Sequence, residues 1–128
     1  MDFKLLFVDD ERAILNGIER LLGFDYDLDT AESGKEALET IANNGPYDII
    51  FTDMRMPAMD GLQFVAEARK IAPASTFIML TGNTDKETFV KAMHEARVFR
   101  FLNKPCDAGT LQLAIADAAE QGGQATPS

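Results

Sequence analysis

Five short apolar runs recur along the chain, and stretches with the 3.6-residue period of an amphipathic helix separate them. This alternation is typical of repeated strand-helix units, which fold into a parallel sheet with helices on both faces. The sequence therefore predicts an α/β fold. The expected strands cover residues 4–8, 26–31, 47–52, 76–80 and 98–102.

The expected helices carry start signals, because a short polar side chain at a cap accepts a hydrogen bond from an otherwise unpaired backbone N–H. Three pairs of residues have the spacing of a capping box: Ser33 with Glu36, Thr84 with Glu87, and Asp60 with Gln63. Apolar side chains follow at helical spacing, and we expect them to pack on the sheet. In the fourth helix these are Phe89, Val90 and Met93.

The length of 128 residues fits one folded domain, which we place at residues 1–121. Hydrophobic residues make up 46% of the chain, enough for a real core. Residues 122–128 are rich in small and polar residues, so we expect a flexible tail or the start of a linker there. The lone Cys106 has no partner for an internal disulfide and reads as a packing residue.

The formal net charge of −9 argues against direct binding to nucleic acid or to an anionic membrane surface. The apolar run at residues 5–8 is far too short for a membrane-spanning helix or a signal-peptide core, and acidic residues follow it at once. We therefore expect a cytoplasmic protein.

Polar residues that could take part in catalysis or ligand binding follow four of the five expected strands. In an open parallel sheet the carboxyl ends of the strands meet at the ligand-binding edge. The second strand, which ends before Glu32, is the exception. The first strand ends at Asp9 and Asp10, the third at Asp53, the fourth at Thr81 and the fifth at Lys104.

Each of these residues also has an ordinary structural explanation. Asp9 or Asp10 could cap the first helix, and Asp53 could be a turn residue. Thr81 could serve the strand end, and Lys104 could be a solvated surface charge. Their conjunction at one edge favours a functional site.

Three carboxylates in one place repel one another, and a bound cation stabilises such a cluster. Oxygen ligands with open coordination positions suit Mg²⁺. A carboxylate is ionised at neutral pH, so Asp53 could attack phosphorus without a general base. Lys104 and Thr81 could then hold oxygens of the transferred group, whose charge must be neutralised.

Four stretches together resemble the signature of the response-regulator receiver domain, the partner of sensor histidine kinases. The resemblance covers residues from about 3 to 120. The family fold is a five-stranded, doubly wound, flavodoxin-like parallel sheet with strand order 2-1-3-4-5 and five flanking helices. The stretches are VDDE at 8–11, TDMRMPAMDG at 52–61, LTG at 80–82 and FLNKP at 101–105.

The resemblance implies a role for each matching residue. Asp53 corresponds to the phosphoacceptor, Thr81 to the hydroxyl residue that senses the phosphoryl group, Phe101 to the aromatic switch, and Lys104 to the phosphate-binding lysine. Pro105 lies where the family commonly has a cis peptide bond. The implied ligands of Mg²⁺ are Asp9, Asp10, Asp53 and the backbone carbonyl of Arg55.

The resemblance also implies partners. A sensor histidine kinase or a phosphotransfer protein would donate the phosphoryl group. An output domain, a partner protein or a second copy of the domain would bind the face formed by the fourth helix, the fifth strand and the fifth helix. The domain would promote only its own phosphorylation and dephosphorylation, and His94 reads as a surface residue and not as a donor. Arg55 and Asn83 occupy the positions that tune phosphoryl lifetime.

Two other functions stay open at this point. A phosphatase of the haloacid-dehalogenase type also uses an aspartate nucleophile with Mg²⁺, but it carries a second acid where this chain has Arg55. A receiver-like module could instead act by contact alone, without phosphorylation. The complete set of site residues argues against that second alternative.

Overall fold

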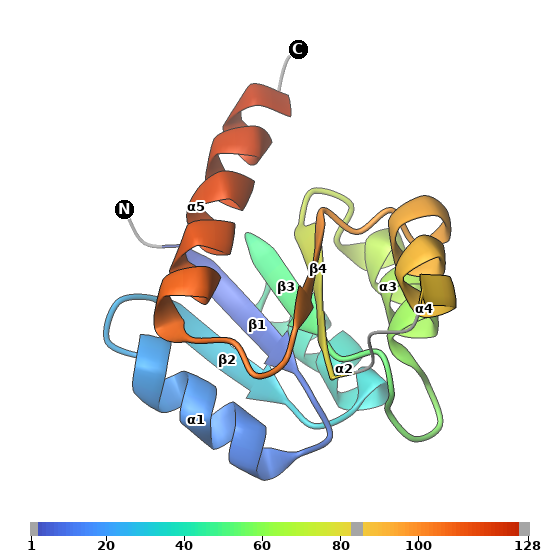
Figure 1. Cartoon of the computed structure of the whole chain (residues 1–128), viewed down its shortest axis with the longest axis horizontal. Helices are drawn as coiled ribbons and strands as arrows, with labels where there is room; N and C mark the ends of the chain where they lie inside the picture. Colours follow the sequence, from blue (N-terminus) through green and yellow to red (C-terminus); the bar gives the residue numbers. More distant parts are fainter. Residues whose placement is uncertain (1–2, 83–85, 126–128) are drawn as a thin grey trace.

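The structure, a computed structural model, describes residues 3–82 and 86–125. It contains a five-stranded parallel sheet with the order β2-β1-β3-β4-β5, which confirms the predicted fold class (Figure 1). The strands are β1 (Lys4–Val8), β2 (Asp27–Ala31), β3 (Ile49–Thr52), β4 (Thr76–Thr81) and β5 (Arg100–Asn103). The helices are α1 (Arg12–Leu22), α2 (Gly34–Asn44), α3 (Gly61–Ile71), α4 (Lys86–Val90) with the π-helical η1 (Lys91–Glu95), and α5 (Ala108–Ala125).

Helices cover both faces of the sheet and define two hydrophobic cores (Figure 1). Because successive side chains of a strand point to opposite faces, Leu5 and Phe7 join the core under α1 and α5, whereas Leu6 and Val8 join the core under α2, α3 and η1. In the first core the rings of Phe7 and Phe51 stack with centroids 4.2 Å apart. The apolar runs are therefore buried on both sides, as in other covered parallel sheets.

Two of the three expected helix caps are present. Ser33 Oγ accepts a hydrogen bond from the N–H of Glu36 at 3.0 Å. Asp60 and Gln63 form a complete capping box, with bonds of 2.8 and 2.9 Å at the start of α3. The third expected cap residue, Thr84, lies outside the described residues.

The expected apolar face of the fourth helical segment is partly wrong. Phe89 and Val90 are 45% and 42% exposed, and the buried residues of this segment are Thr88 and Ala92. The segment changes from α-helix to π-helix after Val90. A π turn has more residues than an α turn, so a face predicted with the 3.6-residue period does not match the face that packs.

The last helix, α5, is the longest helix that the structure describes. It continues to Ala125, into the segment where we expected a tail or linker, and includes Gly122 and Gly123. Glycine disfavours a helix interior, but this preference is weak compared with the cooperative extension of a helix that has already formed. Among the described residues, no helix is both long and apolar enough to span a membrane.

Gly61, the first residue of α3, lies against the backbone that follows β3. Its N–H donates to the carbonyl of Met54 at 2.8 Å. A Cβ atom at Gly61 would lie 2.4 Å from the carbonyl oxygen of Asp53 and 2.9 Å from Met54 Cα. Any side chain here would push α3 away from Asp53.

We therefore expect Gly61→Ala to lower the free energy of unfolding by about 1–3 kcal/mol, the usual cost of overpacking. Gly17→Ala is the matched control, because Gly17 lies inside α1 and a Cβ there meets no atom within 4 Å. The control should be more stable than the parent by about 0.5–1 kcal/mol, since alanine favours the helix. Urea unfolding measures both changes, and equal stability of Gly61→Ala and the parent would contradict the close packing.

Candidate functional site

Three carboxylates meet at the carboxyl edge of the sheet. Asp9 directly follows β1 and Asp53 directly follows β3. One carboxylate oxygen from each of Asp9, Asp10 and Asp53 lies within 4.8 Å of the other two. Asp9 and Asp53 are only 3% and 7% exposed, whereas Asp10 is exposed. The structure thus brings together the three acids that the sequence predicted to share a site.

Backbone hydrogen bonds hold Asp9 and Asp53 beside each other. The N–H of Asp9 donates to Ala31 at 3.1 Å, and the N–H of Asp53 donates to Val8 at 3.0 Å, so both acids extend the sheet ladder. Asp9 Oδ1 accepts from the N–H of Glu11 at 2.9 Å. Glu11 is itself the N-cap of α1, so the alternative that Asp9 or Asp10 occupies the cap position is wrong.

Lys104 reaches two of the acids from the end of β5. Its Nζ lies 2.5 Å from Asp9 Oδ2 and 3.0 Å from Asp53 Oδ2, and its side chain is only 14% exposed. Its backbone N–H donates to the carbonyl of Thr81 at 3.0 Å, and the peptide bond to Pro105 is cis. The alternative that Lys104 is a solvated surface charge is therefore wrong.

Burial and charge act against each other in this cluster. Burial raises the pKa of the Asp9 carboxyl, and the hydrogen bond from Lys104 offsets this effect only in part. For Lys104, burial alone would lower the pKa, but the hydrogen bonds to Asp9 and Asp53 outweigh it and the pKa is raised. One ammonium therefore stays charged but does not fully compensate the acids, and a second cation would stabilise them further.

A cleft of about 560 Å³ opens over the acids. Thr81, at the end of β4, is buried and lines this cleft, and a Cβ added at the neighbouring Gly82 would meet no atom within 4 Å. The cleft thus offers carboxylates, a hydroxyl and an ammonium around one open space. Its lining residues are Asp10, Glu11, Asp53, Arg55, Thr81, Gly82 and Lys104.

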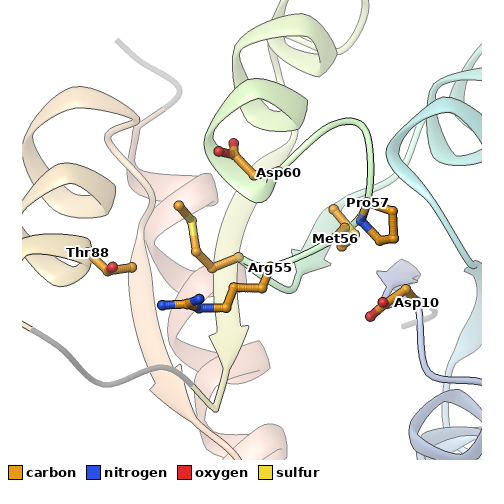
Figure 2. A pocket seen from close by; sticks show the side chains of 7 residues that line it. Asp10, Arg55, Met56, Pro57, Asp60 and Thr88 are labelled. Carbon is orange, nitrogen blue, oxygen red and sulfur yellow. The ribbon is translucent and has the colours of Figure 1, made fainter.

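The side chain of Arg55 points away from Asp10. Figure 2 shows it running from the loop after β3 towards Thr88 on α4, with Asp10 on the opposite side. Both Arg55 and Thr88 line a second hollow of about 500 Å³ beside the first. Arg55 and Asp10 each line both hollows.

Phe101 lies on β5 and packs partly buried against the core under α3 and η1. Its ring meets that of Phe89 edge to face, with centroids 5.4 Å apart and an interplanar angle of 74°. Sequence analysis placed Phe89 in the sheet-facing side of its helix and missed this contact. His94 is an exposed residue of η1.

Comparisons with known proteins agree with this geometry. Residues 5–116 match the sequence model of a family described as the response regulator receiver domain. Transcriptional regulatory protein GlrR of Escherichia coli (strain K12) is 41% identical over 123 residues, which are 95% of this chain and 27% of GlrR. The chain spans about a quarter of the length of the curated transcriptional regulatory proteins that it matches.

Two crystal structures share the fold. A chain from adenylate cyclase of Rhodopirellula baltica is 43% identical, with a TM-score of 0.90, covering 98% of this chain and 93% of that one. A response regulator receiver domain protein from Clostridium thermocellum is 36% identical, with a TM-score of 0.85, covering 93% and 95%. The match therefore extends over the whole sheet and its helices.

The charge balance of the cluster gives a testable prediction. Lys104→Met should lower the free energy of unfolding of the metal-free protein by about 2–4 kcal/mol, because two buried carboxylates lose their shared cation. A divalent cation should raise the melting temperature of this variant more than that of the parent, since it replaces the lost charge. Calorimetric melting with and without the cation measures both effects.

Lys70→Met is the control, because the exposed Lys70 pairs, among the residues that the structure describes, only with Glu67 on the surface of α3, at 3.3 Å. It should change stability by less than about 0.5 kcal/mol. A second control is the double variant Lys104→Met/Asp9→Asn. It should recover part of the stability that Lys104→Met loses, because one buried charge is gone. No recovery would contradict the direct coupling of Lys104 with Asp9.

Proposed function

The chain belongs to the response regulator receiver domain family, and on this premise we propose that Asp53 accepts a phosphoryl group from the phosphohistidine of a sensor kinase or phosphotransfer protein. The observation that carries the proposal is the position of the Asp53 carboxylate, which lies at the end of β3 in an open cleft and 3.0 Å from Lys104 Nζ. Such a carboxylate is a nucleophile without any further base.

In the proposed transfer, a carboxylate oxygen of Asp53 forms a bond to phosphorus while the bond from phosphorus to the donor's histidine nitrogen breaks. The electron pair of the broken bond returns to the imidazole. Negative charge spreads over the three equatorial oxygens during this exchange. Lys104 would neutralise part of that charge, and the Thr81 hydroxyl would donate to one of the oxygens.

The acid cluster fits a divalent cation, and we propose Mg²⁺. The cluster offers hard oxygen ligands at one cleft, which is the donor set that Mg²⁺ prefers. When bound, Mg²⁺ supplies positive charge next to the transferred group. The proposed ligands are Asp9, Asp10, Asp53 and the backbone carbonyl of Arg55.

The receiver would report its state through the face made by α4, β5 and α5. Phosphorylation can change this face only if the phosphoryl group binds more tightly in one conformation than in another. Thr81 at the end of β4 and Phe101 on β5 would carry that difference, with Phe89 as the ring that Phe101 meets. The proposed recipients are an output domain, a partner protein or a second copy of the domain, in the cytoplasm.

Membership of a signalling family supports a signalling role over the phosphatase alternative. The phosphorylation-independent alternative has less support than phosphorylation, because Asp9, Asp53 and Lys104 form one bonded cluster.

The central test is labelling of Asp53. With Mg²⁺ and acetyl phosphate, intact mass should show one added phosphoryl group, and Asp53→Asn should reduce this labelling at least tenfold because the amide is not a nucleophile. Asp48→Asn is the control, since Asp48 lies at the other end of β3, where it accepts from the N–H of Lys4. Labelling of Asp53→Asn to the parent's level would refute the assignment.

The metal assignment has a separate test. Asp10→Asn should weaken Mg²⁺ binding about tenfold or more, because one charged ligand is lost. The neighbouring exposed acid, Glu11, is outside the three-acid cluster, so Glu11→Gln should change the affinity less than about threefold. Without metal, Asp10→Asn should be at least as stable as the parent, since repulsion falls. Titration calorimetry showing equal affinities for both variants would remove Asp10 from the site.

A further inference from the structure

Arg69, on α3, joins that helix to the end of the α4–η1 segment. Its Nη2 donates to the carbonyl of Ala96 at 2.8 Å and to that of Arg97 at 2.7 Å. The guanidinium also lies over the ring of Phe77 on β4, 4.9 Å from the centroid. The side chain is half-buried in a groove between α3 and η1. One side chain of α3 thus contacts both β4 and the end of the α4–η1 segment that follows β4.

The two carbonyls that Arg69 binds lie at the C-terminal end of η1. The last carbonyls of a helix lack partners within the helix and need other donors. Here η1 ends at Glu95, and the N–H of the C-cap residue Ala96 donates to the carbonyl of Lys91 in the i to i+5 pattern of a π-helix. Arg97 then adopts a left-handed backbone conformation with φ of 54°, as residues after a helix end often do. Arg69 therefore supplies, from another helix, the donors that this helix end needs.

Further contacts fix the same end. The N–H of Val98 donates to the carbonyl of Ala92 at 3.1 Å, and both residues are buried. Burial lowers the pKa of the Arg69 guanidinium, and the charge of Arg97 adds to this effect. An arginine remains charged under such a shift, so its hydrogen bonds keep a charged donor.

The α4 part of the segment belongs to the face made by α4, β5 and α5, through which the receiver would report its state. Phe89, about 10 Å along the helix from Ala96 at the usual rise per residue, is 45% exposed and meets Phe101 edge to face. Thr88 lies in the hollow that Arg55 also lines (Figure 2). The C-terminal end of the segment is thus hydrogen-bonded to α3. The contact between Phe89 and Phe101, which would respond to phosphorylation, lies at a distance from that end.

We propose that Arg69 is a positioning residue that fixes the C-terminal end of the α4–η1 segment to α3, so that phosphorylation turns the segment about Ala96 and Arg97. The inference rests on the proposed function, because it describes how that signal reaches Phe89. With this end fixed, a displacement near the site changes the orientation of the α4 face. Without it, the whole segment shifts and its last turn opens.

The test compares Arg69→Met, Arg69→Lys and the control Lys70→Met. Methionine keeps an unbranched apolar side chain over Phe77 but has no donor, whereas lysine keeps a charged donor. In the unphosphorylated protein, amide hydrogen exchange of Ala96 and Val98 should rise about tenfold or more in Arg69→Met, because their helix end loses its donors. Arg69→Lys should show a smaller rise, and Lys70→Met should match the parent.

The second measurement uses beryllofluoride with Mg²⁺ as a phosphoryl mimic, read by amide chemical shifts. In the parent and in Lys70→Met, the shift changes on binding should be large over 86–90 and should decline towards 96–98. In Arg69→Met they should extend through 96–98, with the affinity for the mimic changed less than about threefold, since Arg69 does not touch the site. Arg69→Lys should restore much of the parent's pattern.

Three results would overturn the inference. The first is unchanged exchange of Ala96 and Val98 in Arg69→Met, which would show that the hydrogen bonds do not hold this end. The second is a shift pattern in Arg69→Met that equals the parent's. The third is a parent whose changes at 96–98 are as large as those at 86–90. If the parent does not bind the mimic at all, the proposed function fails, and the exchange measurement still decides whether Arg69 holds the helix end.

Discussion

Repulsion among three carboxylates at one end of the sheet is the constraint on which this structure depends. Val8 and Thr52 pair in the ladder of β1 and β3, so the acids that follow them, Asp9 and Asp53, cannot avoid each other. The fold compensates by bringing Lys104 from the far edge strand, β5, to both acids. Burying a carboxylate costs free energy unless a cation pairs with it. Because Lys104 follows β5, the position of this strand and the electrostatics of the site depend on each other.

The sequence predicted the sheet and the acid site well because both follow from local patterns. Apolar runs bounded by polar residues located all five strands, and β1 has the predicted bounds. The starts of β3 and β5 differ by two residues, since pairing with neighbouring strands decides where a ladder begins. The role of Arg69 and the π turn in η1 could not be predicted, because both depend on contacts between elements that leave no periodic signature.

The site is also connected physically to the segment that would report its state. Gly61 places the first turn of α3 against the carbonyl of Asp53, and the far end of the same helix carries Arg69. Lys104 binds Asp53 through its ammonium and Thr81 through its backbone N–H, so β4 and β5 end at the same group of atoms. Through α3, contacts lead from Asp53 to the C-terminal end of the α4–η1 segment, and along β5 they lead to the ring of Phe101, which meets Phe89. These contacts are a physical route for coupling.

Energy limits how strongly this route can act. Moving a two-state equilibrium from about 1:99 to 99:1 requires about 5.5 kcal/mol of differential binding. Hydrogen bonds to a charged group contribute about 1.5–3 kcal/mol each, so bonds from Thr81 and Lys104 to a phosphoryl group would reach that range only if both were wholly new. Lys104 already donates to Asp9 and Asp53, so its contribution is a difference between two sets of bonds. Phosphorylation alone should then shift the equilibrium only in part. In the proposed function, a partner that binds the α4–β5–α5 face would supply the remainder, and by reciprocity its binding would also favour the phosphorylated site.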